Sequence, residues 1–316
     1  IQKMNMRKTT ILLITFFSFF FAHSQKNISG TIVNKDTKQS IAYAHLIIPS
    51  HKRGTTADKN GKFEFTVPDD WIGSILKITC VGFVENTIVL KRGKDIVIYL
   101  EPAVEFLNAV HLSNEERQDI VRVNSFRGKR SIGLGNFSGG AYPSMFARYY
   151  PYNISLGDEN YLKEVSIFFF KEGRHNAKFR LRIVSSTADK MPKDDLLDPI
   201  IVDISYKQAK EVIKMPANGI EVPEEGFFVV VEHLFIEENA FEEVIHLQVS
   251  NSMQIQDIKQ KRYAPIFKGI IENDGDSHSY YMSIDGWKKV RKLKMPRADF
   301  KAEEVVAPAF KLKLTN

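Results

Sequence analysis

The chain has a single cysteine, Cys80, among its 316 residues. One cysteine excludes an intramolecular disulfide. Cys80 alternates with Ile78 along an expected strand, and its sequence neighbourhood provides neither a histidine partner nor an electropositive setting that would activate a thiol. We therefore expect a buried and unreactive side chain.

Several motifs of catalysis and nucleotide binding are also missing. The sequence has no His-x-x-Glu pair for a zinc peptidase and no Gly-x-Ser-x-Gly elbow for a serine hydrolase. Gly133, Gly135 and Gly140 do not have the Gly-x-Gly-x-x-Gly spacing of a phosphate-binding loop. We predict no catalytic residues, no cofactor and no metal site, and therefore a protein that is not an enzyme.

The excess of positive charge is small once its location is considered. The formal net charge is +6, but Lys3, Arg7 and Lys8 lie in a segment, residues 1–24, that has no acidic residue. The remaining chain carries 41 basic against 38 acidic residues. A charge this close to neutral does not indicate a nucleic-acid partner.

The first residues have the pattern of a secretory signal peptide. Arg7 and Lys8 precede an apolar run at 11–21, and Ala22 and Ser24 are small residues at the positions that signal peptidase requires before Gln25. The run extends for less than about 20 Å, whereas the hydrocarbon core of a bilayer measures about 30 Å. We expect cleavage between Ser24 and Gln25, no transmembrane span in the mature chain, and a location in the periplasm, the outer membrane or at the cell surface.

Short alternating runs separated by turn residues follow the signal segment. Asp58-Lys59-Asn60-Gly61 is typical of a hairpin turn, and almost no helical periodicity is present. The pattern predicts an antiparallel β-sandwich over residues 25–100. Its expected strands lie at 28–33, 42–48, 62–67, 75–80, 87–90 and 95–100.

A set of short motifs in this module resembles a known family. The motifs are Gly30–Val33, Ile41–Ala44, Gly54–Asp58, Asn60–Phe63 and Val81–Phe83, in that order. Together they resemble the carboxypeptidase regulatory-like domain, a transthyretin-like (prealbumin-like) Greek-key sandwich of about seven strands. The resemblance implies a stabilising or interaction domain without peptidase chemistry.

The same domain precedes the plug and barrel of TonB-dependent receptors. Residues 96–100 and 107–112 are similar to the junction that follows it there. Only about 200 residues remain, without repeated ten-residue amphipathic strands, so we expect neither plug nor barrel.

A polar segment at 101–125 is predicted to link the first module to a second one at 126–316. Ser113–Glu116 forms a capping-box pattern that predicts a short helix through Val123. In the second module the run at 178–185 alternates, which predicts Phe179, Leu181 and Ile183 inside and Lys178, Arg180 and Arg182 outside. The other expected strands lie at 162–170, 199–204, 226–236, 266–271, 279–284 and 309–314. Their number and spacing predict a jelly-roll-like sandwich, and so an all-β chain.

Features of the second module resemble a module of envelope proteins from the Bacteroidota. They are Phe179–Arg182, Leu196–Pro199 and Val222–Val229 followed by Glu232. The form of that module is similar to the jelly rolls of carbohydrate-binding domains. The resemblance implies no specific activity.

Two groups of residues have side chains that are typical metal ligands. Glu232 and His233 are adjacent on an expected strand, so they point to opposite faces and a core carboxylate in a hydrogen-bond network is the favoured interpretation of Glu232. His246 lies further along the chain. Asp274–His278 lacks the following bidentate glutamate of a calcium loop, which favours a turn.

Basic and aromatic residues gather near the end of the chain. Tyr280, Trp287, Lys288, Lys289 and Arg291 could form a surface for an anionic glycan or lipopolysaccharide, because aromatic faces stack on sugars and cations neutralise acidic groups. The favoured alternative is an edge strand whose lysines oppose aggregation.

We therefore predict a secreted, non-enzymatic envelope protein that acts by binding or assembly. Its partner would be an envelope protein or a glycan. One alternative is a carbohydrate-binding accessory to polysaccharide uptake. Another is a hydrolase that uses two carboxylates, since eight glutamates occur between Glu221 and Glu243.

Overall fold

A computed structural model describes most of the chain beyond the predicted signal peptide. The described residues are 25–103, 120–124, 126, 128–136, 141–153, 160–171, 175–217, 219–248, 255–273, 278–290, 301 and 303–316. Their regular structure is β-strand with short 3-10 turns and no α-helix, which confirms the all-β prediction. Residues 1–24, 104–119 and 274–277 and Arg291 lie outside the described residues.

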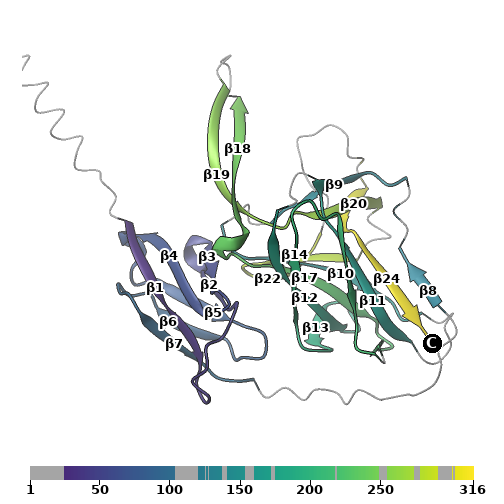
Figure 1. Cartoon of the computed structure of the whole chain (residues 1–316), viewed down its shortest axis with the longest axis horizontal. Helices are drawn as coiled ribbons and strands as arrows, with labels where there is room; N and C mark the ends of the chain where they lie inside the picture. Colours follow the sequence, from purple (N-terminus) through teal and green to yellow (C-terminus); the bar gives the residue numbers. More distant parts are fainter. Residues whose placement is uncertain are drawn as a thin grey trace, which may run out of the picture.

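The first module is a sandwich of two sheets. Its strands are β1 (Gln25–Asn34), β2 (His45–Ile48), β3 (Arg53–Thr56), β4 (Lys62–Pro68), β5 (Ile75–Thr79), β6 (Asn86–Val89) and β7 (Ile96–Leu100). One sheet has the order β4-β1-β7 and the other β3-β2-β5-β6 (Figure 1). β1 and β7 are parallel, while the other pairs are antiparallel.

Alternation along these strands places their apolar residues between the two sheets. Ile28 and Ile32 of β1 meet Leu46 of β2 and Ile78 of β5 in one buried cluster. The predicted turn after β3 forms because the Asp58 carboxylate accepts the backbone N–H of Asn60 and of Lys62, each at 2.8 Å.

The second module is a larger sandwich. Its strands are β8 (Ile120–Val123), β9 (Ser131–Leu134), β10 (Met145–Tyr150), β11 (Tyr161–Phe168), β12 (Ala177–Ser186), β13 (Pro192–Asp195), β14 (Ile200–Ile204), β15 (Lys210–Lys214), β16 (Ile220–Glu221), β17 (Phe227–His233), β18 (Ala240–Gln248), β19 (Ile255–Tyr263), β20 (Phe267–Asn273), β21 (Ser279–Ser283), β22 (Gly286–Lys289), β23 (Glu304–Pro308) and β24 (Phe310–Thr315).

The larger sheet has the order β13-β12-β17-β10-β21-β22, with β14 also paired to β12. The facing sheet has the order β15-β11-β24-β8, with β16 also paired to β11, and a small sheet has the order β23-β20-β9. β18 and β19 pair only with each other among the described residues. We call this hairpin the arm, and Figure 1 shows it standing away from both sandwiches.

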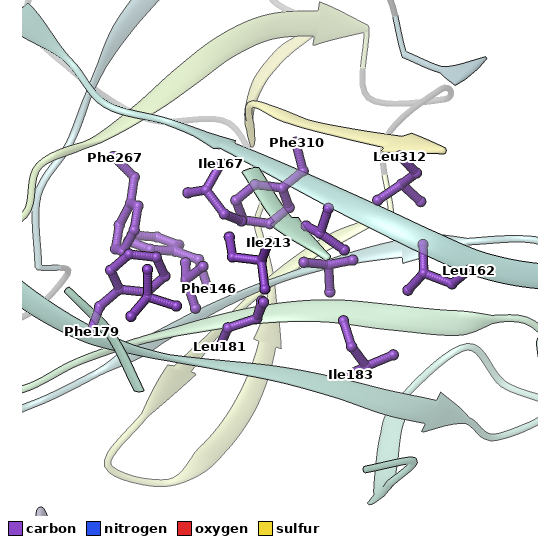
Figure 2. Packing of buried hydrophobic residues seen from close by; sticks show 14 of the residues in the cluster. Phe146, Leu162, Ile167, Phe179, Leu181, Ile183, Ile213, Phe267, Phe310 and Leu312 are labelled. Carbon is purple, nitrogen blue, oxygen red and sulfur yellow. The ribbon is translucent and has the colours of Figure 1, made fainter. Parts of the chain in front are cut away.

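The main core fills the space between the larger sheet and its facing sheet. Phe179, Leu181 and Ile183 of β12 point inward, as their alternation predicts, and meet Leu162 of β11 and Leu312 of β24 (Figure 2). All seven residues of β17 are buried, because both faces of this central strand are covered.

Two sequence expectations fail in the second module. The capping-box pattern predicted a helix from Ser113 through Val123; residues 113–119 lie outside the described residues, and Ile120–Val123 forms β8, which pairs at the edge of β24 with Val121 opposite Leu314. Met145–Tyr150, inside the segment expected to be a turn-rich entry, is the central strand β10 between β17 and β21.

No helix in the described part of the chain combines the length and the hydropathy that crossing a bilayer requires.

Removing Phe179 tests the importance of the second core. Its side chain is 0% exposed and its ring contacts that of Phe267 at a centroid distance of 5.2 Å. We expect Phe179→Ala to lower the free energy of unfolding by about 3–5 kcal/mol, because a large cavity remains. Urea denaturation, followed by the fluorescence of Trp287 in a Trp71→Phe background, measures this loss. Tyr206→Ala, at a side chain that is 61% exposed, should change the same value by less than about 0.5 kcal/mol.

Candidate functional site

The two modules meet along the edge strand β3. Its Gly54 N–H donates to the Ala141 carbonyl at 2.9 Å, and its Thr56 N–H donates to the Phe235 carbonyl at 3.3 Å. The Phe235 N–H in turn donates to the Thr56 hydroxyl at 2.8 Å. The edge of the first module is therefore covered by the second one, which removes an open strand edge from the surface.

A buried ionic cluster lies beside this edge. Glu232 of β17 is 0% exposed and pairs with Arg180 of β12 and with His45 of the first module. Arg180 also donates to the Tyr43 carbonyl of the first module at 2.9 Å. His45 Nδ1 lies 2.9 Å from the Thr56 hydroxyl, so the cluster continues into β3. Ionic and backbone contacts thus fix one arrangement of the two modules; we call this set of contacts the junction.

The junction holds Glu232 in its ionised form. Burial alone would raise the pKa of the carboxyl, but the Arg180 guanidinium and His45 outweigh it and lower the pKa to about 2. Apolar packing of Tyr43 against Leu234 and Ile236 surrounds the contact. Water is kept away from the ion pairs by this packing.

Glu232 and its neighbour His233 do point to opposite sides of the sheet. The His233 ring packs in the main core against Phe146 and Phe267, at centroid distances of 6.0 and 5.1 Å. Burial lowers the pKa of His233 to about 4. Within the described residues no group of three His, Cys, Asp or Glu side chains could hold a metal ion, and the side chain of His246 lies outside this description.

A cleft of about 490 Å³ opens beside the junction, with one wall from each module. The first module provides Asn27, Thr55, Asp58, Lys62, Glu64, Phe65 and Thr66, and the second provides Phe235, Ile236, Glu237, Lys261 and Tyr263. Most of these side chains are polar. Clefts of this size at domain boundaries commonly bind small ligands.

Of the five charged side chains at the cleft, the three carboxylates and Lys261 are engaged with protein groups. Lys261 pairs with Glu237 at 2.6 Å, and the Asn27 amide donates to Glu64 at 2.9 Å. The Asp58 carboxylate is used in the turn described above. What the cleft offers a ligand is therefore a set of amide, hydroxyl and paired ionic groups with no strong field of either sign.

Aromatic rings are present on both walls of the cleft. The Tyr263 ring stacks on Phe235 with a centroid distance of 3.9 Å and an interplanar angle of 13°. Because Phe235 is buried at the junction, this stack fixes the orientation of Tyr263. Phe65 lies half-buried on the opposite wall.

The candidate glycan residues Tyr280, Trp287, Lys288 and Lys289 lie on β21 and on β22, which is the edge strand of the larger sheet. Tyr280 is only 6% exposed and packs with Ala147 and Val230 on the outer face of the larger sheet, where Trp287 is half-buried. Lys288 and Lys289 are exposed, and Lys288 pairs with Asp285 at 3.1 Å. The buried Tyr280 does not present a ring face to a ligand.

Sequence reasoning placed Arg180 outside, and this expectation is wrong in one respect. Arg180 does point away from the main core, but it is only 4% exposed because the first module covers that face.

Cys80 is half-buried rather than buried, and burial raises the pKa of its thiol. The cleft and the junction were not predicted. The signal that could have found the junction is one ionisable residue in each of two apolar strands, at His45 and at Glu232.

Comparison with known proteins identifies the first module. Residues 28–112 match the family model of the CarboxypepD_reg-like domain, which confirms the predicted resemblance. TonB-dependent receptor P3 of Formosa agariphila is 23% identical over 96 residues, which are 30% of this chain and 9% of the receptor. The chain therefore spans less than a tenth of the length of this curated relative.

Solved structures share only weak likeness with the whole chain. The cysteine protease and lectin-like domains of Cwp84, a surface-layer-associated protein of Clostridium difficile, give a TM-score of 0.31 at 11% identity, covering 59% of this chain and 36% of that one. A candidate carbohydrate binding protein from Bacteroides uniformis gives 0.21 at 10% identity, covering 77% and 97%. At these TM-scores neither likeness bears on function.

Breaking the junction should uncouple the modules. Arg180→Ala leaves Glu232 buried without its main partner, which we expect to cost about 3–5 kcal/mol. Single-tryptophan variants that retain Trp71 in the first module or Trp287 in the second report the unfolding of each. In the parent protein the two tryptophan probes should give the same urea midpoint. With Arg180→Ala they should give two different midpoints.

Arg182→Ala is the matched control for the junction. Arg182 lies on the same strand and pairs with Asp195 of the same module at 2.6 Å. Arg182→Ala should destabilise the second module but should separate the two midpoints less than Arg180→Ala does. Coincident midpoints in Arg180→Ala would contradict the coupling.

The depressed pKa of His233 predicts a loss of stability in mild acid. The unfolded state gains a proton near pH 6.5 while the folded state stays neutral down to about pH 4, so stability falls as the pH drops through this window. Between pH 6.5 and pH 5 the loss should be about 2 kcal/mol. Urea midpoints should show this loss in the parent and not in His233→Gln, and an equal pH dependence of both would refute it. Glu232 contributes little above pH 5, because its carboxyl is ionised there in the folded protein and the same carboxyl of the unfolded chain takes up its proton only near its ordinary pKa of 4.5.

Proposed function

We propose that this chain is a non-enzymatic binding protein of the bacterial envelope that holds a neutral saccharide in the cleft between its modules. The observation that carries the proposal is the cleft itself. Its walls come from two modules that the junction fixes in one arrangement. A preformed site of this kind does not have to be ordered by its ligand, which favours affinity.

The chemistry of the lining favours a neutral polyol over an ion. Sugar hydroxyls both donate and accept hydrogen bonds, and the cleft offers both roles through Asn27, Thr66 and the Glu237–Lys261 pair. Phe65 and Tyr263 provide flat apolar surfaces for the C–H faces of a sugar ring. A strongly charged ligand would meet three carboxylates and two lysines, which together leave little net charge to attract it.

The envelope location is supported by the signal-peptide pattern at 1–24 and by the match of the first module to a TonB-dependent receptor. Carboxylates at Asp58, Glu64 and Glu237 also line the cleft, so a glycoside hydrolase is the alternative to be tested. We favour binding because each of the three carboxylates is engaged by a neighbouring donor.

A glycan array probed with residues 25–316 tests the proposal. We expect binding to at least one neutral glycan and expect Asn27→Ala combined with Thr66→Ala to weaken it at least about tenfold, because each lost hydrogen bond costs about 0.5–1.5 kcal/mol. Isothermal titration with the best glycan measures the change at low and at physiological salt. Neutral recognition should depend little on salt.

Trp287→Ala and Lys288→Ala are the matched controls, since they alter the surface that sequence alone indicated. Binding lost in these variants and retained in the cleft variants would reject the cleft. Absence of any glycan binding would reject the saccharide. If the parent protein hydrolyses the bound glycan and Glu64→Gln or Glu237→Gln does not, the cleft is a catalytic site and the binding proposal is rejected.

A further inference from the structure

The arm is unusually exposed for a two-stranded sheet. β18 and β19 have nine residues each and pair with no other described strand. The base of the arm is anchored where Phe241 stacks on His175 and Tyr263 stacks on Phe235. Further out, Val244 is 45% exposed and Ile258 is 40% exposed. Isolated two-stranded hairpins are marginally stable in water, so a further strand would stabilise this one.

We propose that β19 pairs with β19 of a second copy of this chain, in an antiparallel two-fold dimer centred on Ile258. A two-fold axis through Ile258 places Asp257 of each copy opposite Lys259 of the other. Both side chains are exposed, and opposite residues of an antiparallel ladder share a face. The contact is self-complementary, as the interface of a symmetric dimer has to be.

Other registers of the same two strands are opposed by charge. An axis through Asp257 sets this residue against its own copy. An axis through Lys259 pairs Asp257 with Lys261 twice but sets Lys259 against its own copy. An axis through Gln260 sets Lys259 against Lys261 twice. The order of charges along β19 therefore selects Ile258 as the centre.

The geometry of the arm allows this pairing. Figure 1 shows the arm standing away from both sandwiches, and a two-fold axis at the arm places the body of the second copy at the opposite end of the four-stranded sheet. Lysines on an edge strand often serve only to prevent such pairing. Here Asp257, two residues before Lys259, converts repulsion into attraction in one register.

Charge exchange within one strand gives the decisive test. Sedimentation velocity of residues 25–316, from about 5 µM to about 1 mM, should show a weak monomer–dimer equilibrium that weakens with salt. Asp257→Lys and Lys259→Asp each create two like-charge contacts in the dimer. Each should raise the dissociation constant at least about tenfold.

Two rescue experiments separate the interface from damage to the hairpin. The double variant Asp257→Lys/Lys259→Asp restores opposite charges and should dimerise again. An equimolar mixture of the two single variants should form the heterodimer, although neither associates alone. In the double variant the exposed Lys259–Glu242 pair stays broken, and in the mixture each chain keeps the hairpin of its own single variant, so rescue cannot come from repair of the hairpin.

Val244→Lys and Ile258→Lys form a matched pair on the two strands of the arm. Only Ile258→Lys should weaken the dimer. A protein that stays monomeric at about 1 mM, or a dimer that the charge exchanges leave unchanged, overturns the proposal. Loss of association in Val244→Lys alone would place the contact on β18 and overturn it as well.

Discussion

The structure depends on keeping the Glu232 carboxylate charged inside the protein. This side chain is 0% exposed, so its charge is tolerable only while Arg180 and His45 stay against it. His45 belongs to the first module and Arg180 to the second. The part of the larger sheet's outer face around Arg180 and Glu232, which would meet solvent in an isolated second module, is therefore an interior surface in this chain. Buried ion pairs add little net stability, but breaking one is costly, and this makes the relative position of the modules specific.

One continuous segment connects the junction, the cleft and the arm. β17 carries Glu232 and leads to Phe235, whose backbone bonds to Thr56 of β3. The chain then enters β18 and returns along β19 to Tyr263, which stacks on Phe235. The ring that lines the cleft is thus fixed by the residue that fixes the modules, and the arm leaves the body at the same point. A change in module arrangement would move the wall of the cleft and the direction of the arm together.

Alternation along the strands predicts which face of a strand is apolar, and it does so correctly for Phe179, Leu181 and Ile183. It does not predict what covers the opposite face, which is why Arg180 was expected in solvent. The family motifs identify the first sandwich because they mark turns and close contacts that its fold requires. The arm was missed for a different reason. On β18 the adjacent Glu242 and Glu243 place charges on both faces, and on β19 the adjacent Lys259 and Gln260 place polar side chains on both faces, so neither strand alternates between apolar and polar residues. At 120–123 a strand takes the place of the expected helix, because pairing with β24 outweighs a local capping signal.

Ionic contacts act in two different ways in this molecule. At the junction, burial makes each partner indispensable, because an unpaired charge there has no access to water. On the arm, the charges of Asp257 and Lys259 are exposed and each pair contributes little energy. Their order along the strand still distinguishes one register from its neighbours, since like charges oppose every other centre from Asp257 to Gln260. In both places the charges determine which arrangement forms, while apolar contacts such as those of Tyr43 with Leu234 and Ile236 provide most of the attraction.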